Sequence, residues 1–378
     1  MRGAGAKVTP LELFFDLIFV LALTQCTALM AADLSWLGIS RGLLVLAVLW
    51  WAWVGYAWLT SVVDPEEGEV RIAIFVSMAA MLVASLCVPA AFGDLGLLFV
   101  AAYAVVRFGQ IALFIFASAD DPNLRQAVIG LGISTMLGVG PLIAAAFTDG
   151  WLQIGLWVLA IAVDWAGPLV TDSSGWRLSA EHFAERHGLI VIIALGESIV
   201  AIGIGATSGV DGWVVLAASL GTAVCAALWW LYFDIVALVA ARKLESTPVG
   251  LAQNTLARDA FSYLHFPMVA GIVLVALGLK KTLSDTGYPL YPESATALFG
   301  GVVLYLVALS AFRRRNMGQF NRGRLVLAGL LVAFIPVATR IPAVSSLAVL
   351  TVALVGFLAV EVRSSGEARS RIRAELRH

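Results

Sequence analysis

The chain has 378 residues and a formal net charge of −1, and it is 61% hydrophobic but only 13% charged. Ordinary soluble domains carry about 25% charged residues, so this composition excludes a cytosolic enzyme, a secreted domain and a nucleic-acid-binding protein with a basic face. A polytopic membrane protein remains, because about twelve helices of ~20 residues would fit the apolar part of the chain.

Twelve continuously apolar windows follow one another along the chain. Backbone groups in a bilayer have no water to bond with, so windows of this length predict α-helices rather than the alternating segments of a β-barrel. The sequence therefore predicts an all-α, polytopic integral membrane helix bundle. The windows are 11–31, 37–60, 71–92, 95–118, 126–147, 151–171, 186–206, 212–240, 260–280, 294–312, 324–340 and 343–362.

The windows predict a single transmembrane domain over 1–378 that ends in a basic cytoplasmic tail, 363–378. Two similarities hint at an internal duplication: ELFFDLIFVLAL opens the first window and ERHGLIVIIALGES the seventh, and the letters LWW occur in the second and the eighth. Two six-helix halves, 1–172 and 173–362, would explain both. Chance similarity between apolar segments explains them equally well.

Basic residues are distributed unevenly between the loops. Most of the 24 lysines and arginines fall on one predicted side, whereas the other side carries Arg41, Lys280, Lys281 and Arg340. The positive-inside rule then places both termini in the cytoplasm. The basic clusters at 313–315 and 363–377 make membrane lipid an expected partner.

Charged side chains inside the windows are costly, at about 2.5–3.5 kcal/mol each at the bilayer centre. The spans contain five acids but only two arginines, so three acids lack a fixed positive partner. We expect these acids to share a polar pocket entered from the cytoplasm. The alternative is that they only hydrogen-bond between helices and fix the packing. Leaving aside the other charges at the window ends, the charged residues of the windows are Glu12, Asp16, Arg107, Asp164, Arg186, Glu197 and Asp234.

The predicted roles follow from depth and spacing. Glu197 and Asp16 are the expected proton carriers, with Asp164 and Asp234 as further acids of the pocket. The residues expected to bind a substrate or balance charge are Glu12, Arg107, His182, Glu185, Arg186, His187 and His265.

Four segments resemble the bacterial low temperature requirement A (LtrA) family of membrane proteins. They are LELFFDLIFVLALTQ (11–25), EHFAERHGLIVIIALGESIV (181–200), LWWLYFD (228–234) and SYLHFPMVAGIVLVALG (262–278). The resemblance implies a multi-pass membrane protein of the bacterial cytoplasmic (inner) membrane, with both termini in the cytoplasm, and carries no mechanism with it. Matched by motif, the polar positions of the family are Glu12, Asp16, His182, Glu185, Arg186, Glu197 and His265.

Cofactors are not expected from the motifs. The sequence holds no Walker motif and no dinucleotide-binding fingerprint, which argues against ATP-driven work by this chain. His182 and Glu185 have the spacing of a metal-binding pair in helix bundles. Arg186 lies on the same stripe as His182, however, and would repel a dication, so no metal site is predicted.

Two functional hypotheses remain, and the sequence identifies neither the substrate nor the oligomeric state. The first is proton-coupled transport of a small solute, for which buried carboxylates would carry the proton. The second is an intramembrane enzyme that uses a buried carboxylic acid to protonate or cyclise a lipid or isoprenoid. A structural or regulatory protein, whose buried charges only specify packing, is a weaker third reading.

Overall fold

The computed structural model describes residues 7–171, 175–206 and 209–375, and the predicted all-α fold is confirmed over these ranges. They contain helices and one isolated β-bridge between Pro289 and Pro342, but no strand. Eleven helical segments of the described chain are long and apolar enough to cross a membrane. A further apolar helix, α14 (Arg322–Ala338), is 17 residues long. The chain is therefore a multi-pass membrane protein.

Contacts divide the chain into two compact units. The first unit runs to Arg186 and also contains Leu244–Ser262, and the second contains His187–Lys243 and the chain from Tyr263 onward. Helix α7 (Ala180–Gly205) contributes its beginning to the first unit and the rest to the second.

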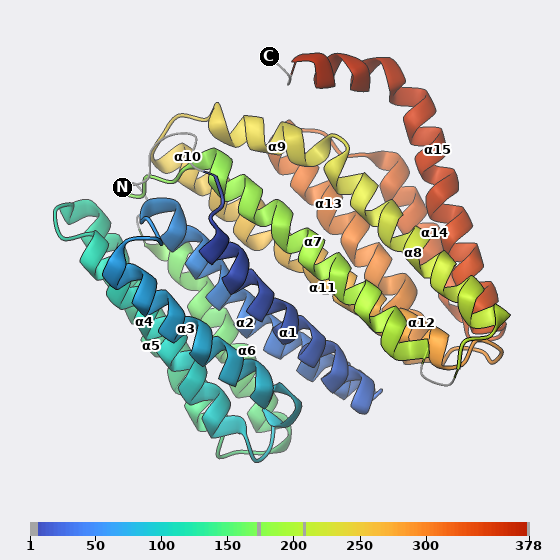
Figure 1. Ribbon diagram of the computed structural model, residues 1–378, viewed down its shortest axis with the longest axis horizontal. Helices are drawn as coiled ribbons and strands as arrows, with labels where there is room; N and C mark the ends of the chain where they lie inside the picture. The colour runs from blue at the N-terminus through green and yellow to red at the C-terminus, as the bar shows by residue number, and fades with distance from the viewer. Residues whose placement is uncertain (1–6, 172–174, 207–208, 376–378) are drawn as a thin grey trace. The chain divides into compact units, whose positions relative to one another are not determined.

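The first unit is built from long helices joined by short loops (Figure 1). Pro10 stands in the first turn of α1, whose start is closed by a capping box between Thr9 and Glu12, and the Asp121 side chain caps α5. The helices are α1 (Pro10–Ala32), α2 (Trp36–Val62), α3 (Gly68–Cys87), the short η1 (Val88–Ala90), α4 (Gly96–Ala117), α5 (Pro122–Ala145), α6 (Gly150–Val170) and α10 (Leu251–Leu256).

Helix α2 forms the centre of the first unit. Its most apolar stretch is 83% buried, and it packs against α1, α4 and α6. Helices α5 and α6 pack closely because Gly138 leaves room for the Cβ of Asp164, which would lie 2.8 Å from a Cβ at that position. The outer helices carry large exposed apolar side chains, such as Leu97, Phe116 and Ile133. These side chains are suited to contact lipid.

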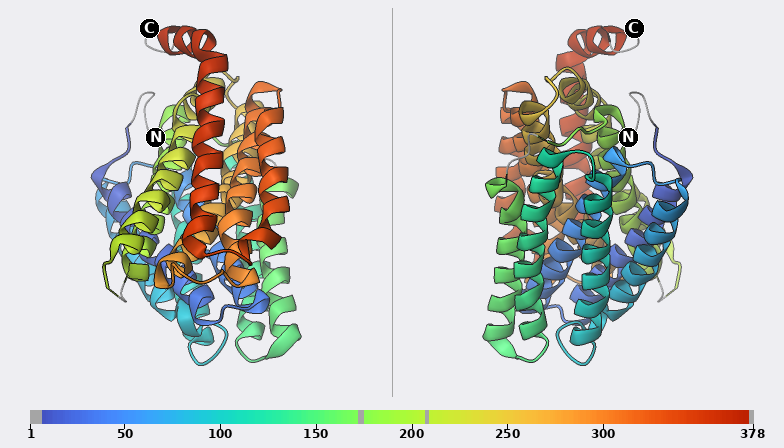
Figure 2. Two further views of the ribbon diagram at one scale, coloured as in Figure 1. Left: turned by 90° about the vertical axis from the view of Figure 1, so that its right-hand side faces the viewer. Right: turned by 90° about the vertical axis from the view of Figure 1, so that its left-hand side faces the viewer.

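The second unit packs around α11. Gly271 of α11 and Gly301 of α13 lie against each other's backbone, where an added Cβ would come within 2.6 Å of a carbonyl oxygen. Helix α15 packs on α8 and α14 (Figure 2). Besides α7 and α14, the helices are α8 (Gly212–Phe233), α9 (Val236–Glu245), α11 (His265–Ser284), α12 (Pro292–Ala295), α13 (Gly301–Met317) and α15 (Ala343–Glu375).

Two π-helical segments interrupt the predicted regular spans: η3 (Ala257–Tyr263) and η4 (Thr296–Gly300). Hydropathy does not reveal them, because a π-turn inserts one residue into the hydrogen-bond ladder without changing the apolar character of the segment. In η3, the Ser262 backbone carbonyl accepts a hydrogen bond from Trp50 Nε1 at 3.0 Å. The widened turn is thus tied to α2 inside the first unit.

Candidate functional site

Four predicted residues meet inside the first unit, and we call Glu12, Asp16, His182 and Arg186 the acid cluster. Glu12 and Asp16 are one turn apart on α1, so they share a face of that helix. Arg186 donates to Glu12 Oε1 at 3.2 Å and to Asp16 Oδ1 at 2.7 Å. His182 Nε2 lies 2.8 Å from Glu12 Oε1. All four side chains are at most 2% exposed.

Helix α2 completes the shell of the acid cluster with residues that the sequence analysis did not assign to it. Trp53 Nε1 donates to Asp16 Oδ1 at 2.8 Å, and the Arg186 guanidinium lies 5.6 Å from the centre of the Trp53 ring. Arg186 also donates to Thr60 Oγ1 at 3.2 Å. The second oxygen of Asp16, Oδ2, is buried and has no hydrogen-bond partner among the described residues.

The acid cluster has an unequal number of opposite charges. It holds two carboxyl groups and a single guanidinium, and its imidazole adds a positive charge only when protonated. With neutral His182, the four side chains carry a net charge of −1, and one added proton makes them neutral. One proton therefore switches these four side chains between a net charge of −1 and zero.

A second buried ion pair lies in the same unit between α4 and α6. Arg107 Nη2 donates to both oxygens of Asp164, at 2.8 and 3.1 Å. The Tyr103 hydroxyl donates to Asp164 Oδ2 at 3.2 Å, and Thr135 of α5 lies between the two charges, 2.8 Å from Arg107 Nη2. This pair has one acid for one arginine.

Helix α2 separates the acid cluster from a cavity on its other side. Trp53 faces the acid cluster, whereas Gly55 lines the cavity; two positions along a helix correspond to a rotation of about 200°. The sequence predicted one common polar pocket. The structure instead places the two predicted arginines of the first unit in separate groups, because side chains from opposite faces of α2 cannot share one chamber.

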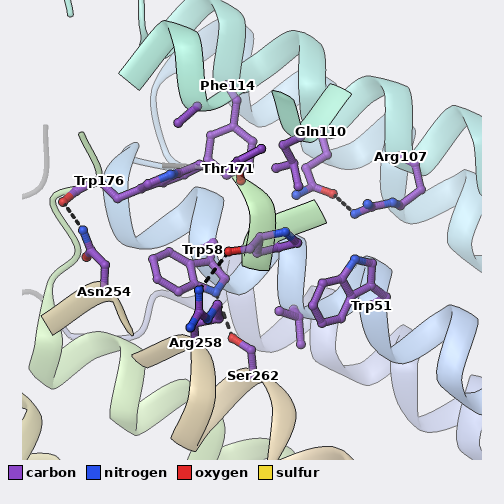
Figure 3. A pocket seen from close by; sticks show the side chains of 15 residues that line it. Trp51, Trp58, Arg107, Gln110, Phe114, Thr171, Trp176, Asn254, Arg258 and Ser262 are labelled. Carbon is purple, nitrogen blue, oxygen red and sulfur yellow. Dashed lines mark hydrogen bonds between the residues drawn. The ribbon is translucent and has the colours of Figure 1, made fainter. Parts of the chain in front are cut away.

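The cavity has a volume of about 70 Å³, which is enough for roughly five waters. Rings of Trp51, Trp58, Phe114 and Trp176 form much of its wall (Figure 3). Its polar lining residues include Arg107, Gln110, Thr171, Asn254, Arg258 and Ser262.

The other predicted residues make contacts of their own. Glu185 is exposed and accepts a hydrogen bond from the Val8 backbone N–H at 3.2 Å. In the second unit, the rings of His187 and His265 lie 5.2 Å apart, and His265 Nε2 is 2.8 Å from the Tyr232 hydroxyl. Tyr232 was not predicted as a site residue, although it stands within the LWWLYFD motif.

Glu197 and Asp234 belong to the second unit. Glu197 is 1% exposed on α7, and Asp234 is 8% exposed at the end of α8. Of the five acids predicted inside the spans, the three in the first unit each contact one of the two arginines. The roles assigned to Glu197 and Asp234 stay predictions.

Metal binding finds no ready-made site in the described part of the chain. Nowhere in the described ranges do three or more His, Cys, Asp or Glu side chains gather so that they could hold a metal ion. His182 instead contacts Glu12 Oε1, and Arg186 contacts the same oxygen.

Comparison with known proteins identifies relatives along nearly the whole chain. The family model for the bacterial low temperature requirement A protein (LtrA) matches residues 7–359. The chain is 31% identical over 370 residues to the uncharacterized protein RA0937 of Rhizobium meliloti (strain 1021), covering 93% of this chain and 87% of that protein. No solved structure shows significant similarity. The chain therefore belongs to the bacterial low temperature requirement A family.

Proposed function

We propose that the protein is a proton-coupled carrier of a small solute in the bacterial cytoplasmic membrane. The observation that supports this proposal is the charge imbalance of the acid cluster, where two buried carboxyl groups share one arginine and one histidine. Such a group changes its net charge from −1 to zero when it takes up one proton. A carrier needs a buried group of this kind to couple solute movement to a proton gradient.

The location of the cluster suits exchange of protons with one side of the membrane. Glu12 lies in the first turn of α1, and His182 and Arg186 lie in the first two turns of α7. The charge bias of the loops supports cytoplasmic termini, so we assign this end of α1 to the cytoplasmic face. Protons would then reach the cluster from the cytoplasm.

Protonation would change how α1 and α7 hold together. A neutral Asp16 no longer attracts Arg186 as an ion, so the arginine keeps Glu12 as its charged partner. Two arrangements of one guanidinium between two acids supply a two-state element that a proton biases. Glu197, buried further along α7, is our candidate for the next proton carrier.

The intramembrane enzyme receives less support from the contacts. A general acid must present a proton to its substrate. In the first unit, however, Glu12, Asp16 and Asp164 each contact an arginine, and none of the three lines the aromatic cavity in which a substrate could be held. We therefore favour the carrier.

Reconstituted protein tests the proposal. Proteoliposomes that enclose a pH-sensitive dye are given a panel of small anionic, cationic and neutral solutes at equal pH on both sides. A proton-coupled carrier changes the internal pH with at least one class of solute, and Asp16→Asn reduces that change more than tenfold. Glu181→Gln, which removes an exposed acid from the first turn of α7, serves as the matched control and retains it.

Two results would overturn the carrier. One is an internal pH that follows that of protein-free liposomes with every solute. The other is undiminished coupling in folded Asp16→Asn protein. Chemical conversion of a lipid in detergent, where no gradient exists, would instead favour the enzyme.

A further inference from the structure

We propose that the aromatic cavity beside α2 binds a small organic anion, with Gln110 and Arg258 as its polar anchors. This inference names the substrate class of the proposed carrier and rests on that function for its role. Binding itself needs no proton gradient and can therefore be tested separately. All residues that line the cavity belong to the first unit.

Gln110 presents an unused donor to the cavity. Its side chain is 1% exposed, and its Oε1 accepts a hydrogen bond from Arg107 Nη1 at 2.8 Å. That bond fixes the orientation of the amide and leaves the Nε2 group without a hydrogen-bond acceptor among the described residues (Figure 3). A ligand that accepts a hydrogen bond from this amide therefore binds more tightly than one that cannot.

Gly55 of α2 makes room for this amide. A Cβ at position 55 would lie 2.1 Å from Gln110 Nε2 and 2.3 Å from its Oε1. Any other residue at this position would displace the Gln110 side chain. The close approach of α2 to the amide thus places the donor against the cavity wall.

Arg258 supplies positive charge nearer the surface. It stands on η3 and is partly exposed, and it donates to the Pro168 carbonyl of α6 at 2.9 Å. Its neighbour Asp259 accepts from it at 2.8 Å, but that carboxyl is 31% exposed and is not part of the lining. Of the described residues that line the cavity, two are arginines and none is acidic.

The walls select an apolar, planar body. Trp51, Trp58, Phe114 and Trp176 surround the space, and aromatic rings pack well against flat apolar groups. Space for roughly five waters fits a ligand of a few heavy atoms, or the ring end of a somewhat larger one. The ligand that fits these aromatic walls and the two polar anchors is a carboxylate or phosphate on a compact apolar group.

Calorimetric titration of the full chain in detergent tests this with three probes of similar size that share a phenyl ring. Benzoate, benzamide and benzylamine are anionic, neutral and cationic. We expect saturable binding of benzoate, with at least tenfold weaker binding of benzamide and no binding of benzylamine. Decanoate is the fourth probe: tighter binding than benzoate indicates a membrane-derived acid, and weaker binding a water-soluble one.

Two substitutions place the site. Gln110→Glu keeps an acceptor for Arg107 but replaces the free amide with an oxygen, so it should weaken benzoate binding at least tenfold and allow benzylamine to bind. Arg258→Gln should weaken benzoate binding about fivefold or more. Arg125→Gln removes an exposed positive charge of α5 outside the cavity and should leave the Kd unchanged.

The proposal fails if benzoate does not bind the folded protein, if benzylamine binds it as tightly, or if Gln110→Glu leaves benzoate binding intact. The carrier can fail independently. Asp16→Asn should retain benzoate binding while it loses proton coupling. Benzoate binding without any proton movement would thus support the binding site and reject the carrier.

Discussion

The acid cluster and the Arg107–Asp164 pair are both buried in the first unit, but they balance charge differently. In the pair, one guanidinium meets one carboxylate, and Tyr103 and Thr135 complete the hydrogen bonding. In the cluster, one guanidinium serves two carboxyl groups, and Asp16 Oδ2 has no hydrogen-bond partner among the described residues. Burying either group costs free energy of desolvation, but only the cluster becomes neutral when it binds a proton.

The difference separates a group that holds helices together from one that can change state. A closed pair tolerates no loss of either partner, since the other is left charged in a medium that cannot solvate it. A cluster with a surplus carboxylate tolerates neutralisation of one acid. The following substitutions test this contrast, from the largest expected change in the free energy of unfolding to the smallest.

Asp164→Ala should have the largest effect. It leaves Arg107 buried without its counter-ion, so we expect the free energy of unfolding to fall by about 3–5 kcal/mol. Denaturant unfolding in detergent measures this change. The double variant Arg107→Met, Asp164→Leu removes both charges and should recover most of the loss. An unchanged stability of Asp164→Ala would reject the pair as a structural element.

Trp53→Phe should have the next largest effect. It removes the indole N–H that donates to Asp16 but keeps a ring beside Arg186. A hydrogen bond to a charged group contributes about 1.5–3 kcal/mol, and the same unfolding assay should detect a loss of that size. In an Asp16→Asn background the loss should shrink, because the acceptor is then neutral. Equal losses in the two backgrounds would contradict the assigned contact.

Tyr103→Phe should destabilise the protein by about 1.5 kcal/mol, the lower end of the range for a hydrogen bond to a charged group, because the hydroxyl lies 3.2 Å from Asp164 Oδ2. The substitution removes only the hydroxyl donor to Asp164, which keeps the two hydrogen bonds from Arg107. A loss as large as that of Asp164→Ala would mean that the hydroxyl, rather than the arginine, holds the carboxylate.

Asp16→Asn should change the free energy of unfolding least, by less than about 1 kcal/mol. The amide oxygen can still accept from Trp53, and the cluster loses its surplus charge while Arg186 keeps Glu12. Parallel unfolding of Asp16→Asn and Asp164→Ala compares the two groups directly. Equal destabilisation by both variants would show that the cluster is a structural pair like the other.

The sequence alone determined that the chain is a helical membrane protein, and it pointed to most of the charged side chains that lie buried, although Glu185 is exposed. These follow from local properties: a window of apolar residues must become a helix in lipid, and a charge within it must find a partner or water. The helical spacing also placed Glu12 and Asp16 on one face of α1 before any contact was known.

Only the tertiary structure decided which charges meet. His182 lies 170 positions from Glu12 in the chain and 2.8 Å from it in space, and nothing local in either segment indicates that contact. The contacts of Trp53 with Asp16 and of Gln110 with Gly55 also join segments that are distant in the sequence. Trp53 and Gly55 lie on opposite faces of α2, which keeps the acid cluster and the cavity apart. Hydropathy describes the tendency of each residue to leave water. Which charged side chains pair depends on which helix faces pack together, and that is a property of the whole fold.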